Sequence, residues 1–502
     1  MLVSVITSPE QIAASLPLAD MFEFRLDHLY GTRPALVNFG EHLLSPSALL
    51  DLENLSKFPS ISATHWDSKS AAKNSPNLTA HRIREIPKSP LPVMFTYRKK
   101  EQGGKGELAE DERLTRLEKL LEYGPEYCDL EADTDPLWIE RLAKKFPNVK
   151  FVGSYHNFTE TPDDLETLYQ SMRRPEFSLY KIATTAQSTL DMLRLFEFAR
   201  GKKNLAWISM GKLGQPSRIL SPLTGSPFCY ATLDEESPPL FQVNLQTLVQ
   251  LYRIRTLNEK TKIFALIGNP LEASIGYLYH NQVFAEKNEN AVYVNLPVLQ
   301  DELDELFEIF RRLPFVGISV TMPYKTSVIP FLDELGQDAE KIGAVNTILF
   351  RGGKAIGYNT DGIGACDALE QHLPLKKKKI ALLGAGGASR AVAFELAQRG
   401  AEITIFNRTF ETAEKLAAYL GCRASHFEEL YSGKFDLLIN AIPHPPIDLD
   451  RLAFPPFVMD IAVTTQESPL LQKAKEQGCH AIEAKEMFYE QAKLQQKLWH
   501  NS

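Results

Sequence analysis

Short apolar runs recur along the first half of the chain, and longer segments with apolar residues at helical spacing separate many of them. The runs predict eight strands, at residues 2–7, 21–25, 93–97, 127–131, 150–156, 179–184, 205–210 and 228–233. The helical spacing predicts helices at residues 114–123, 137–145, 163–172 and 188–200. Strands and helices that alternate in this order are typical of a parallel (β/α)8 barrel, so we expect one such barrel in the first half.

A second pattern begins near residue 262, where the polar stretch 256–261 gives way to an apolar strand at 263–267. A predicted helix at 243–255 closes the barrel and leads into the second half without a long flexible linker. The 502 residues are long for one domain and sufficient for three compact units, each able to bury a core.

Chemically useful side chains gather near the ends of the predicted barrel strands. They are Glu23, Arg25, Arg98, Glu131, His156, Lys181 and Arg218. The carboxyl ends of the strands form the active site in this fold, so the placement predicts a reaction centre. A lysine acts as an amine nucleophile only when its ammonium form is disfavoured, and the apolar run 179–183 around Lys181 predicts such surroundings. A lone lysine in such a run would more often be a surface residue on an edge strand.

Six short motifs follow one another along this half: Glu23-Phe24-Arg25-Leu26-Asp27, Thr96-Tyr97-Arg98, Asp129-Leu130-Glu131, Ser154-Tyr155-His156-Asn157-Phe158 with Thr161-Pro162, Lys181-Ile182-Ala183, and Ser209-Met210-Gly211 followed by Ser217-Arg218. In type and order they resemble the motifs of the type I 3-dehydroquinate dehydratases. The resemblance covers most of residues 1–250. Each motif is weak alone, and their shared order makes the combination specific.

This resemblance implies that Lys181 forms a Schiff base with the substrate ketone, while His156 acts as general base and acid and Glu131 orients the imidazole. Arg218 clamps the substrate carboxylate, because a guanidinium can donate two parallel hydrogen bonds to it. The other residues expected to bind substrate are Glu23, Arg25, Arg98, Ser237 and Gln242. No metal is needed for this chemistry. The segment 237–242 departs from the family's Ser-Ala-Pro-Gly-Gln, and the long interval 27–93 predicts an inserted loop or helix.

A separate signal lies in the second half, where a predicted strand at 379–383 runs into a glycine-rich turn at 384–388. Backbone N–H groups at the start of the following helix can bind a pyrophosphate. Because a tight strand-to-helix turn needs glycine whether or not anything binds, the turn alone is weak evidence. The next strand ends at Arg408, where an acidic residue is expected for NAD, so Arg408 favours the 2′-phosphate of NADP. The alternative is a solvated arginine after a strand.

Further motifs flank the glycine-rich turn: Gly268-Asn269-Pro270 with Ser274 and His280-Asn281, Val320-Thr321-Met322-Pro323-Tyr324-Lys325, Gly343-Ala344-Val345-Asn346-Thr347, Gly357-Tyr358-Asn359-Thr360-Asp361-Gly362, and Lys485-Glu486-Met487-Phe488-Tyr489-Glu490-Gln491-Ala492. Together they resemble shikimate dehydrogenase over about residues 262–499. An isolated lysine and aspartate would more often form a structural ion pair, and the surrounding Thr, Asn and Gln residues favour a site.

The second resemblance implies that Lys325 and Asp361 are the catalytic pair. A lysine held by a carboxylate can protonate the alkoxide that forms when hydride reaches a ketone. The residues expected to bind the substrate are Ser274, Thr321, Asn346, Asp361 and Gln491. Those expected to bind NADP(H) are Gly384, Gly386, Gly387, Ala388, Asn407, Arg408 and Thr409.

Two departures from the family pattern affect this half. The family's His-Ser-x-Ser-Pro is replaced by Ala273-Ser274-Ile275-Gly276-Tyr277, so one of two substrate-binding hydroxyls is missing at Gly276. The segments 440–444 and 463–465 also differ, which predicts a reshaped nicotinamide pocket. The preference between shikimate and quinate stays open at this point.

Composition adds little to this picture. The chain is 44% hydrophobic and 24% charged, as globular proteins are, and its net charge of -8 disfavours nonspecific nucleic-acid binding. Five cysteines lack paired or metal-ligand spacing, and neither a signal peptide nor a long apolar span is visible. We therefore expect a cytoplasmic protein with small-molecule substrates, without a nucleic-acid or membrane partner. The oligomeric state is not predicted.

The expected fold is α/β, with an N-terminal (β/α)8 TIM barrel at 1–255 and a two-domain shikimate-dehydrogenase-like unit. That unit comprises a substrate-binding domain at 262–360, with a C-terminal helix at 484–502, and a Rossmann NADP-binding domain at 361–483. The expected function is dehydration of 3-dehydroquinate to 3-dehydroshikimate, followed by reduction to shikimate with NADPH. The alternatives are a quinate/shikimate dehydrogenase of altered specificity in the second half, or a metabolite-sensing regulator built from degenerate enzyme halves.

Overall fold

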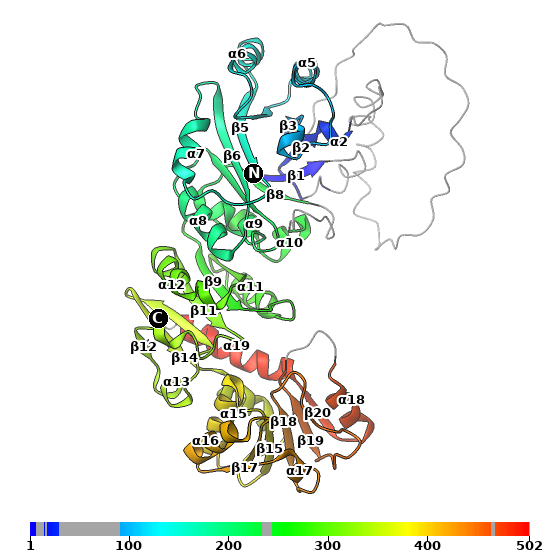
Figure 1. The fold of residues 1–502 in the computed structure, drawn as a ribbon, viewed down its shortest axis with the longest axis vertical. Helices are drawn as coiled ribbons and strands as arrows, with labels where there is room; N and C mark the ends of the chain where they lie inside the picture. The colour runs from blue at the N-terminus through cyan, green and yellow to red at the C-terminus, as the bar shows by residue number, and fades with distance from the viewer. Residues whose placement is uncertain (7–14, 16–17, 30–90, 233–242, 463–466, 501–502) are drawn as a thin grey trace, which may run out of the picture. The chain divides into compact units, whose positions relative to one another are not determined.

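The computed structural model describes residues 1–6, 15, 18–29, 91–232, 243–462 and 467–500 (Figure 1). The chain divides into two compact units, one formed by residues 1–187 and 198–250 and the other by residues 188–197 and 251–502. The three-domain bounds predicted from the sequence are finer than this division and stay a prediction. The inserted loop or helix expected within 27–93 lies largely outside the described residues.

Eight parallel strands form the sheet of the first unit. They are β1 (Leu2–Ile6), β2 (Met21–Arg25), β3 (Val93–Thr96), β4 (Tyr127–Glu131), β5 (Lys150–Asn157), β6 (Phe177–Thr185), β7 (Leu205–Met210) and β8 (Cys229–Ala231). The order is β7-β6-β5-β4-β3-β2-β1-β8, so β1 pairs with β8, and within the described residues only the junction of β7 and β8 lacks a ladder. The prediction of a (β/α)8 barrel is confirmed by this nearly closed sheet and its intervening helices.

Helices follow most of the barrel strands. They are α2 (Leu26–Leu29), α5 (Glu110–Leu121), α6 (Pro136–Lys145), α7 (Leu165–Met172), α8 (Thr189–Ala199), α9 (Ser217–Leu220) and α10 (Leu245–Gln250). The Asp135 side chain caps α6 by accepting from the N–H of Leu137, and the Asp164 side chain caps α7 in the same way. The prediction of a single helix at 243–255 is wrong. Helix α10 ends at Gln250, and a helix could not continue to residue 255, because Arg253 adopts a left-handed φ of 51° that an α-helix does not accommodate.

The interior of the barrel changes from apolar to charged along its strands. Its apolar part is the buried cluster of Val3, Met21, Met94, Tyr127, Val152, Ala183, Ala206, Ile208, Met210, Phe228 and Tyr230. Side chains two residues apart on a strand share a face. Two positions beyond Met21, Tyr127 and Val152, the same face therefore carries polar or charged side chains, all of them buried: Glu23, Asp129 and Ser154.

The second unit begins with a mixed six-stranded sheet of order β10-β9-β11-β13-β14-β12. The strands are β9 (Lys262–Gly268), β10 (Ala291–Pro297), β11 (Phe315–Val320), β12 (Glu334–Leu335), β13 (Thr347–Arg351) and β14 (Lys354–Tyr358). Helices α11 (Gly276–Glu286), α12 (Leu303–Arg312) and α13 (Gln337–Ile342) accompany it, as does the C-terminal α19 (Ala484–His500). Trp499 of α19 donates from its indole to the carbonyl of Ile348 at 3.2 Å, which fixes α19 against this sheet.

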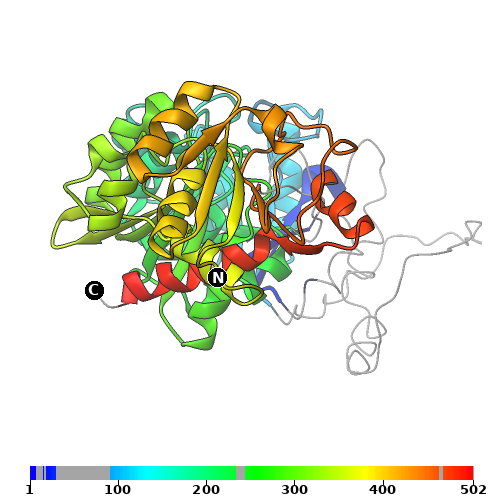
Figure 2. The same cartoon turned by 90° about the horizontal axis from the view of Figure 1, so that it is seen from below.

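The remaining sheet is parallel and has the order β17-β16-β15-β18-β19-β20. Its strands are β15 (Lys379–Leu383), β16 (Glu402–Phe406), β17 (Arg423–Ser425), β18 (Leu437–Asn440), β19 (Phe457–Asp460) and β20 (His480–Glu483). Its helices are α14 (Asp361–Glu370), α15 (Gly387–Gln398), α16 (Phe410–Leu420), α17 (Phe427–Leu430) and α18 (Pro469–Glu476), with helices on both sides of the sheet (Figure 2). The strand order reverses between β15 and β18, which is where such a Rossmann sheet forms its ligand crevice.

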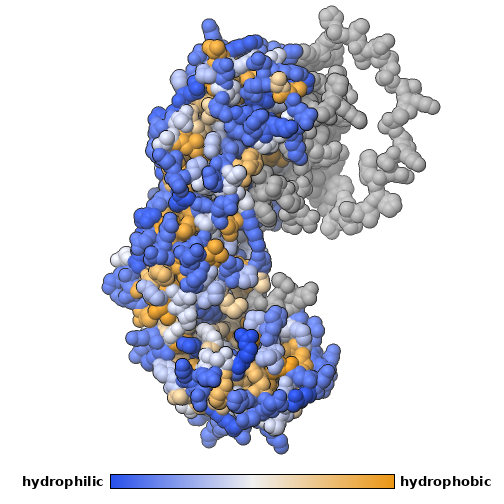
Figure 3. Space-filling model, in the orientation of Figure 1, coloured by the Kyte–Doolittle hydropathy of each residue, from blue (hydrophilic) through white to orange (hydrophobic). Residues whose placement is uncertain are grey.

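Polar residues cover most of the face drawn in Figure 3, and the apolar residues on it form small groups. Of the helices in the described part of the chain, none is long and apolar enough to cross a membrane.

Candidate active sites

Lys181 lies on β6 inside the barrel, where only 4% of it is exposed. Its Nζ is 3.1 Å from Oδ2 of Asp129 and 3.5 Å from Oε2 of Glu23, and it lies 4.5 Å above the centre of the Tyr230 ring. The apolar surroundings predicted for Lys181 are therefore wrong: it is buried, but among charges. Neighbouring residues on a strand face opposite sides, so the apolar neighbours of Lys181 in sequence do not surround its ammonium group.

Arg98 connects the carboxylates of this cluster. It donates from Nη2 to Asp129 at 2.8 Å and from Nη1 to Glu131 at 3.2 Å and to the Ser154 hydroxyl at 2.6 Å. The Ser154 hydroxyl donates in turn to the other oxygen of Asp129 at 2.5 Å. Burial works against the charge of Asp129, but Arg98 and Lys181 together hold the pKa of this carboxyl well below its usual range. Asp129 is thus a fixed anion beside the lysine.

His156 ends β5, and Gln102 fixes its ring. The Gln102 amide oxygen accepts from the main-chain N–H of His156 at 3.0 Å and lies 3.3 Å from Nδ1. Because an amide oxygen can only accept, we assign the ring proton to Nδ1, which leaves Nε2 as the basic nitrogen. Burial, reinforced by the positive charges of Arg98 and Lys181, holds the pKa of His156 well below its ordinary value. The imidazole is therefore neutral near pH 7.

Glu131 contacts other partners than the imidazole among the described residues, so the orienting role predicted for it stays a prediction. Its Oε1 accepts from the main-chain N–H of Lys99 at 2.9 Å and pairs with Arg98, while its Oε2 pairs with Arg113 at 3.1 Å. The carboxylate pairs with two arginines and one backbone donor, although its Oε2 forms no hydrogen bond among the described residues. The group that contacts the imidazole ring is Gln102.

Two glycines bring Gln102 to the histidine. Gly103 has a φ of 84°, and a Cβ atom there would lie 2.3 Å from the Phe158 ring. A Cβ atom on Gly104 would lie 2.0 Å from the carbonyl oxygen of Arg98. A side chain at Gly103 would strain the backbone angle, and one at Gly104 would clash with the main chain, so glycine at both positions favours the turn that carries Gln102.

The two other predicted arginines differ in how their guanidinium groups are satisfied. Arg25 forms a two-pronged pair with Asp27, at 2.9 and 2.8 Å. Arg218 on α9 donates from Nη1 to the carbonyl of Ser209 and to the Ser217 hydroxyl, whereas its buried Nε and Nη2 have no partner among the described residues. Burial lowers the pKa of Arg218 to about 10. Ser237 and Gln242, also predicted here, lie outside the described residues.

The second predicted pair is formed in the second unit. Lys325 Nζ donates to Oδ2 of Asp361 at 2.6 Å, and both side chains are largely buried. Lys325 lies in the turn after β11, where the N–H of Val345 donates to its carbonyl oxygen at 2.7 Å. Asp361 is the first residue of α14, where a carboxylate is stabilised by the helix dipole.

Asn346 organises the rest of this cluster. Its Nδ2 donates to Oδ1 of Asp361 at 2.8 Å, to the hydroxyl of Thr360 at 2.9 Å and to Oε1 of Gln491 at 3.3 Å. Its Oδ1 accepts from the hydroxyl of Thr347 at 2.7 Å. The predicted residues Lys325, Asp361, Asn346 and Gln491 thus lie in one connected network, although Gln491 comes from α19, far along the chain.

Two predicted hydroxyls, those of Ser274 and Thr321, lie on turns after β9 and β11. A Cβ atom on Gly268 would lie 2.3 Å from the methyl group of Thr321, so glycine lets Thr321 approach the end of β9. Ser274 accepts from the N–H of Gly276 at 3.3 Å. Gly276 lies next to another hydroxyl, since a Cβ atom at this position would lie 3.3 Å from the phenol oxygen of Tyr293.

The glycine-rich turn joins β15 to α15 as predicted. Gly384 has a φ of 113°, and a Cβ atom there would lie 2.7 Å from Oγ of Ser389, so the turn requires glycine. A Cβ atom on Gly386 would meet nothing within 4 Å, which leaves room for a ligand against the backbone. At Gly387 a Cβ atom would lie 3.1 Å from Cβ of Lys325, so the turn and the lysine are neighbours.

A cavity of about 290 Å³ opens over this turn. Its lining residues are Gly384, Ala385, Gly386, Asn407, Arg408, Ala441, Ile442, Pro443, His444 and Pro446. Asn407 is held by a hydrogen bond from Nδ2 to the carbonyl of Thr409 at 2.9 Å, and Arg408 is exposed. Of the predicted cofactor residues, Gly387, Ala388 and Thr409 border the turns without lining the cavity. The open backbone at Gly386 and the cation at Arg408 fit a dinucleotide that carries an additional phosphate.

Within the described ranges, no group of three or more His, Cys, Asp and Glu side chains has an arrangement that could hold a metal ion. All five cysteines are free thiols.

Comparison with known proteins places both clusters in known families. Residues 4–259 match the family profile of type I 3-dehydroquinase, residues 266–348 that of the shikimate dehydrogenase substrate binding domain, and residues 367–463 that of shikimate / quinate 5-dehydrogenase. The shikimate biosynthesis protein AroDE of Chlamydia muridarum is 36% identical over 389 residues, which covers 76% of this chain and 80% of the relative. The chain belongs to the bifunctional 3-dehydroquinate dehydratase/shikimate dehydrogenase family.

Other relatives match most of the chain or only its dehydrogenase half. The chloroplastic bifunctional 3-dehydroquinate dehydratase/shikimate dehydrogenase of Arabidopsis thaliana is 34% identical over 440 residues, covering 81% of this chain and 72% of the relative. The shikimate dehydrogenase (NADP(+)) of Methanocaldococcus jannaschii is 41% identical over 262 residues, which covers 48% of this chain and 93% of the relative. The solved shikimate dehydrogenase of Thermus thermophilus, in complex with NADP(H) and shikimate, is 31% identical with a TM-score of 0.45, covering 48% and 94%. The predicted cytoplasmic location stays a prediction.

Sequence reasoning missed three residues of the dehydratase half. Asp129 and Ser154 belong to motifs of the sequence analysis but received no role there, and Gln102 belongs to none of those motifs. Asp129 and Ser154 had a usable signal, since each lies two positions before a predicted residue on the same strand and so shares its face. Gln102 had none, because an uncharged side chain at the end of a single 3-10 turn belongs to no periodic pattern.

Proposed function

We propose that the chain dehydrates 3-dehydroquinate in its first unit and reduces the resulting 3-dehydroshikimate to shikimate with NADPH in its second. The observation that carries this proposal is the pair of clusters. One holds a buried lysine and a neutral histidine, and the other holds a lysine-aspartate pair beside a glycine-rich turn. The first set of groups suits a lyase that works through a Schiff base, and the second suits a ketone reductase. The product of the first reaction is the substrate of the second.

In the barrel, Lys181 attacks the ketone of 3-dehydroquinate and water leaves to give an iminium. Attack requires a neutral amine, and Oε2 of Glu23, at 3.5 Å and without another hydrogen-bond partner among the described residues, is placed to accept its proton. The fixed negative charge of Asp129, at 3.1 Å, and the face of Tyr230 stabilise the positive iminium that follows.

His156 moves the next proton. The iminium draws electrons from the adjacent carbon, so Nε2 of the neutral imidazole removes a proton there to give an enamine. The protonated imidazole then donates that proton to the departing hydroxyl, which leaves as water. Hydrolysis of the iminium releases 3-dehydroshikimate and returns Lys181 to its starting state.

Arg218 holds the substrate carboxylate in this scheme. Its two unpartnered, buried N–H groups support the assignment, because a buried donor without an acceptor is costly and a bound carboxylate would satisfy both. Arg25, already paired with Asp27, is the weaker candidate for a direct contact.

When bound in the dehydrogenase half, NADPH would supply a hydride to the ketone carbon. Lys325 donates a proton to the oxygen that becomes negative, and Asp361 keeps the ammonium group directed at it. Asn346 and Gln491 position Asp361 and offer further polar contacts to the substrate hydroxyls. The backbone at Gly386 would hold the pyrophosphate and Arg408 the 2′-phosphate.

Neither alternative raised by the sequence is favoured. A regulator built from degenerate halves would have lost catalytic groups, yet both clusters keep theirs. The relatives named above carry shikimate in their names, and quinate occurs only beside shikimate, in the name of the profile that residues 367–463 match.

The deciding experiment follows NADPH consumption by the purified chain supplied with 3-dehydroquinate alone, and with 3-dehydroshikimate alone in parallel. We expect consumption with both. Lys181→Ala should abolish consumption with 3-dehydroquinate and spare the parallel reaction, whereas Lys325→Ala should abolish both, since each assay ends in the reduction. For Lys325→Ala, formation of 3-dehydroshikimate followed by its ultraviolet absorbance should persist. Loss of dehydration in folded Lys325→Ala protein would contradict the assignment of two sites.

A further inference from the structure

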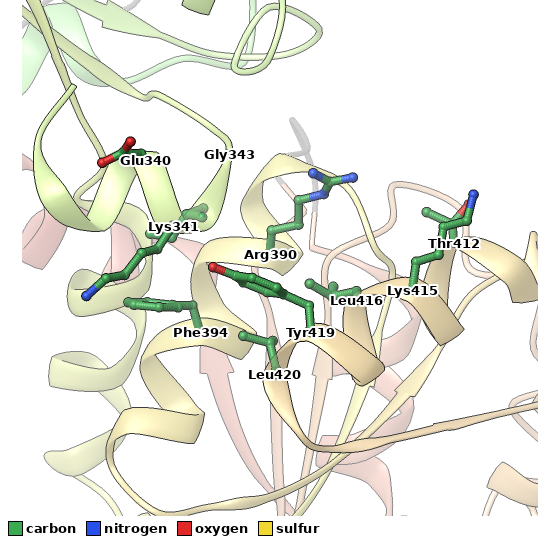
Figure 4. A pocket seen from close by; sticks show the side chains of 11 residues that line it. Glu340, Lys341, Gly343, Arg390, Phe394, Thr412, Lys415, Leu416, Tyr419 and Leu420 are labelled. Atoms are coloured by element: carbon green, nitrogen blue, oxygen red, sulfur yellow. The ribbon is translucent and has the colours of Figure 1, made fainter. Parts of the chain in front are cut away.

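A second cavity of the dehydrogenase half, of about 560 Å³, lies between the end of α13 and the helices α15 and α16 (Figure 4). Its lining residues are Glu340, Lys341, Ile342, Gly343, Arg390, Phe394, Thr412, Lys415, Leu416, Tyr419 and Leu420. None of them lines the cavity over the glycine-rich turn, and none belongs to the network around Asp361. The mechanism above therefore leaves this cavity without a role.

The charged side chains around the cavity are predominantly cationic. Arg390, Lys415 and Lys341 all line it, whereas Glu340 is the single acid among the lining residues. No side-chain hydrogen bond or ion pair is formed by any of the three cations within the described part of the chain. In Figure 4 the charged ends of Arg390 and Lys415 turn toward the same side of the cavity. The charge of Lys341 extends toward the other end of the cavity, so Arg390 and Lys415 are the two unneutralised cations on one side of it, and they favour an anionic ligand there.

The wall beneath these charges is apolar and rigid. Ile342 and Phe394 belong to a buried cluster with Ala344 and Ala391, and Leu420 packs against that cluster. Tyr419 is different, because 62% of it is exposed although it extends from the same helix face. Figure 4 places its ring beside Arg390, over the apolar wall. An exposed aromatic ring in a cavity offers a stacking surface that a purely ionic ligand would not use.

We propose that this cavity binds an aromatic carboxylate. The ring of such a ligand would stack on Tyr419 above the apolar wall, and its carboxylate would accept two parallel hydrogen bonds from Arg390, with Lys415 as a second cation. The volume lies within the range of small-molecule sites. An inorganic anion would leave the apolar wall exposed, and a neutral aromatic would leave the cations unpaired, so the combination selects for both properties.

The cavity borders two elements that lead to the substrate network and to the cofactor cavity. Gly343 at the cavity precedes Asn346 by three residues, and α15, which carries Arg390, begins at the glycine-rich turn. A ligand that bridges α13 and α15 therefore touches elements leading to the Asp361 network and to the cofactor cavity. Any coupling between the sites must act in both directions.

The test uses the full chain saturated with NADPH, and 3-phenylpropionate as the probe, with binding measured by saturation-transfer NMR and titration calorimetry. We expect binding in the presence of NADPH, and weaker binding by about tenfold or more for 3-phenyl-1-propanol, which lacks the carboxylate. Displacement of the probe by NADPH would place it in the cofactor cavity and overturn the proposal. Equal binding of the acid and the alcohol would also overturn it.

Variants locate the probe. Arg390→Gln and Tyr419→Ala should each weaken 3-phenylpropionate binding by about tenfold. Binding of 3-phenyl-1-propanol should change little in Arg390→Gln, because this ligand lacks the carboxylate, and should weaken in Tyr419→Ala, because it keeps the ring. Lys434→Gln removes an exposed cation outside the cavity and is the matched control, with binding and turnover unchanged. Retained binding in Arg390→Gln, or an equal loss in Lys434→Gln, would contradict the site.

Discussion

The amide oxygen of Gln102 lies 3.0 Å from the main-chain nitrogen of His156 and 3.3 Å from its Nδ1, so one uncharged group fixes both the position and the tautomer of the imidazole. A carboxylate in that place would also stabilise the protonated ring. Gln102 orients the histidine without adding to its basicity, which suits a base that must stay neutral beside Arg98 and Lys181.

Gln102→Leu should lower kcat for dehydration by about tenfold to a hundredfold, because Nδ1 of His156 loses its acceptor. The loss is smaller than that of the general acid-base group itself, since the imidazole remains present. The KM for 3-dehydroquinate should change little. NADPH-dependent reduction of 3-dehydroshikimate by the same protein serves as the internal control and should be unaffected. Gln102→Glu should retain activity and move the acidic limb of the pH profile upward. A leucine variant with unchanged kcat would remove Gln102 from the mechanism.

The pH profile of dehydration should reflect the depressed pKa of His156. Because the folded protein holds this pKa well below 6.5, the base stays neutral when the pH falls through 6.5, and kcat/KM should begin to fall only at lower pH. An acidic limb at or above 6.5 would contradict the assignment.

His156 is also expected to destabilise the fold in acid. Below pH 6.5 the unfolded chain takes up the proton first, so its contribution to the unfolding free energy declines from there toward the folded pKa.

Arg408→Ala should raise the KM for NADPH by about tenfold to a hundredfold and leave that for NADH nearly unchanged, because only NADPH has a 2′-phosphate to lose contact with. Steady-state reduction of 3-dehydroshikimate with each cofactor measures both values. Arg423→Ala is the matched control, since Arg423 is an exposed arginine on β17 paired with Glu429. Equal losses with the two cofactors would exclude Arg408 from the phosphate site.

Gly276→Ser should lower the KM for shikimate by about tenfold in the oxidation direction, because it restores a hydroxyl near Ser274. The side chain fits only if the phenol oxygen of Tyr293, 3.3 Å from the new Cβ, yields slightly. Gly276→Ala adds the same Cβ without the hydroxyl and separates the two effects. If the alanine and serine variants behave alike, the hydroxyl has no part in substrate binding.

The strands were predictable from the sequence because buried parallel strands are rich in apolar residues. The predicted strand 205–210, which is almost entirely apolar, coincides with β7, and the predicted strand 21–25, in which apolar residues surround Glu23, coincides with β2. The helix predicted at 243–255 failed at Arg253, since apolar spacing does not reveal a left-handed backbone angle. The glycine-rich turn succeeded for the opposite reason, because glycine marks such angles directly.

The candidate sites divide in a similar way. Charged residues at strand ends could be predicted to meet, since parallel strands bring their carboxyl ends together. The contact of Gln102 with His156 spans 54 residues and depends on the turn at Gly103. The charged surroundings of Lys181 were hidden because Asp129 and Glu23 come from other strands.

Helix α19 also imposes an order of events during synthesis. Asn346 contacts Gln491 at 3.3 Å and Trp499 bonds the carbonyl of Ile348, so the dehydrogenase network includes some of the last described residues to leave the ribosome. The charged cluster of the barrel draws on residues no later than Tyr230 in the chain. A nascent chain can thus assemble its dehydratase cluster well before its reductase network is complete.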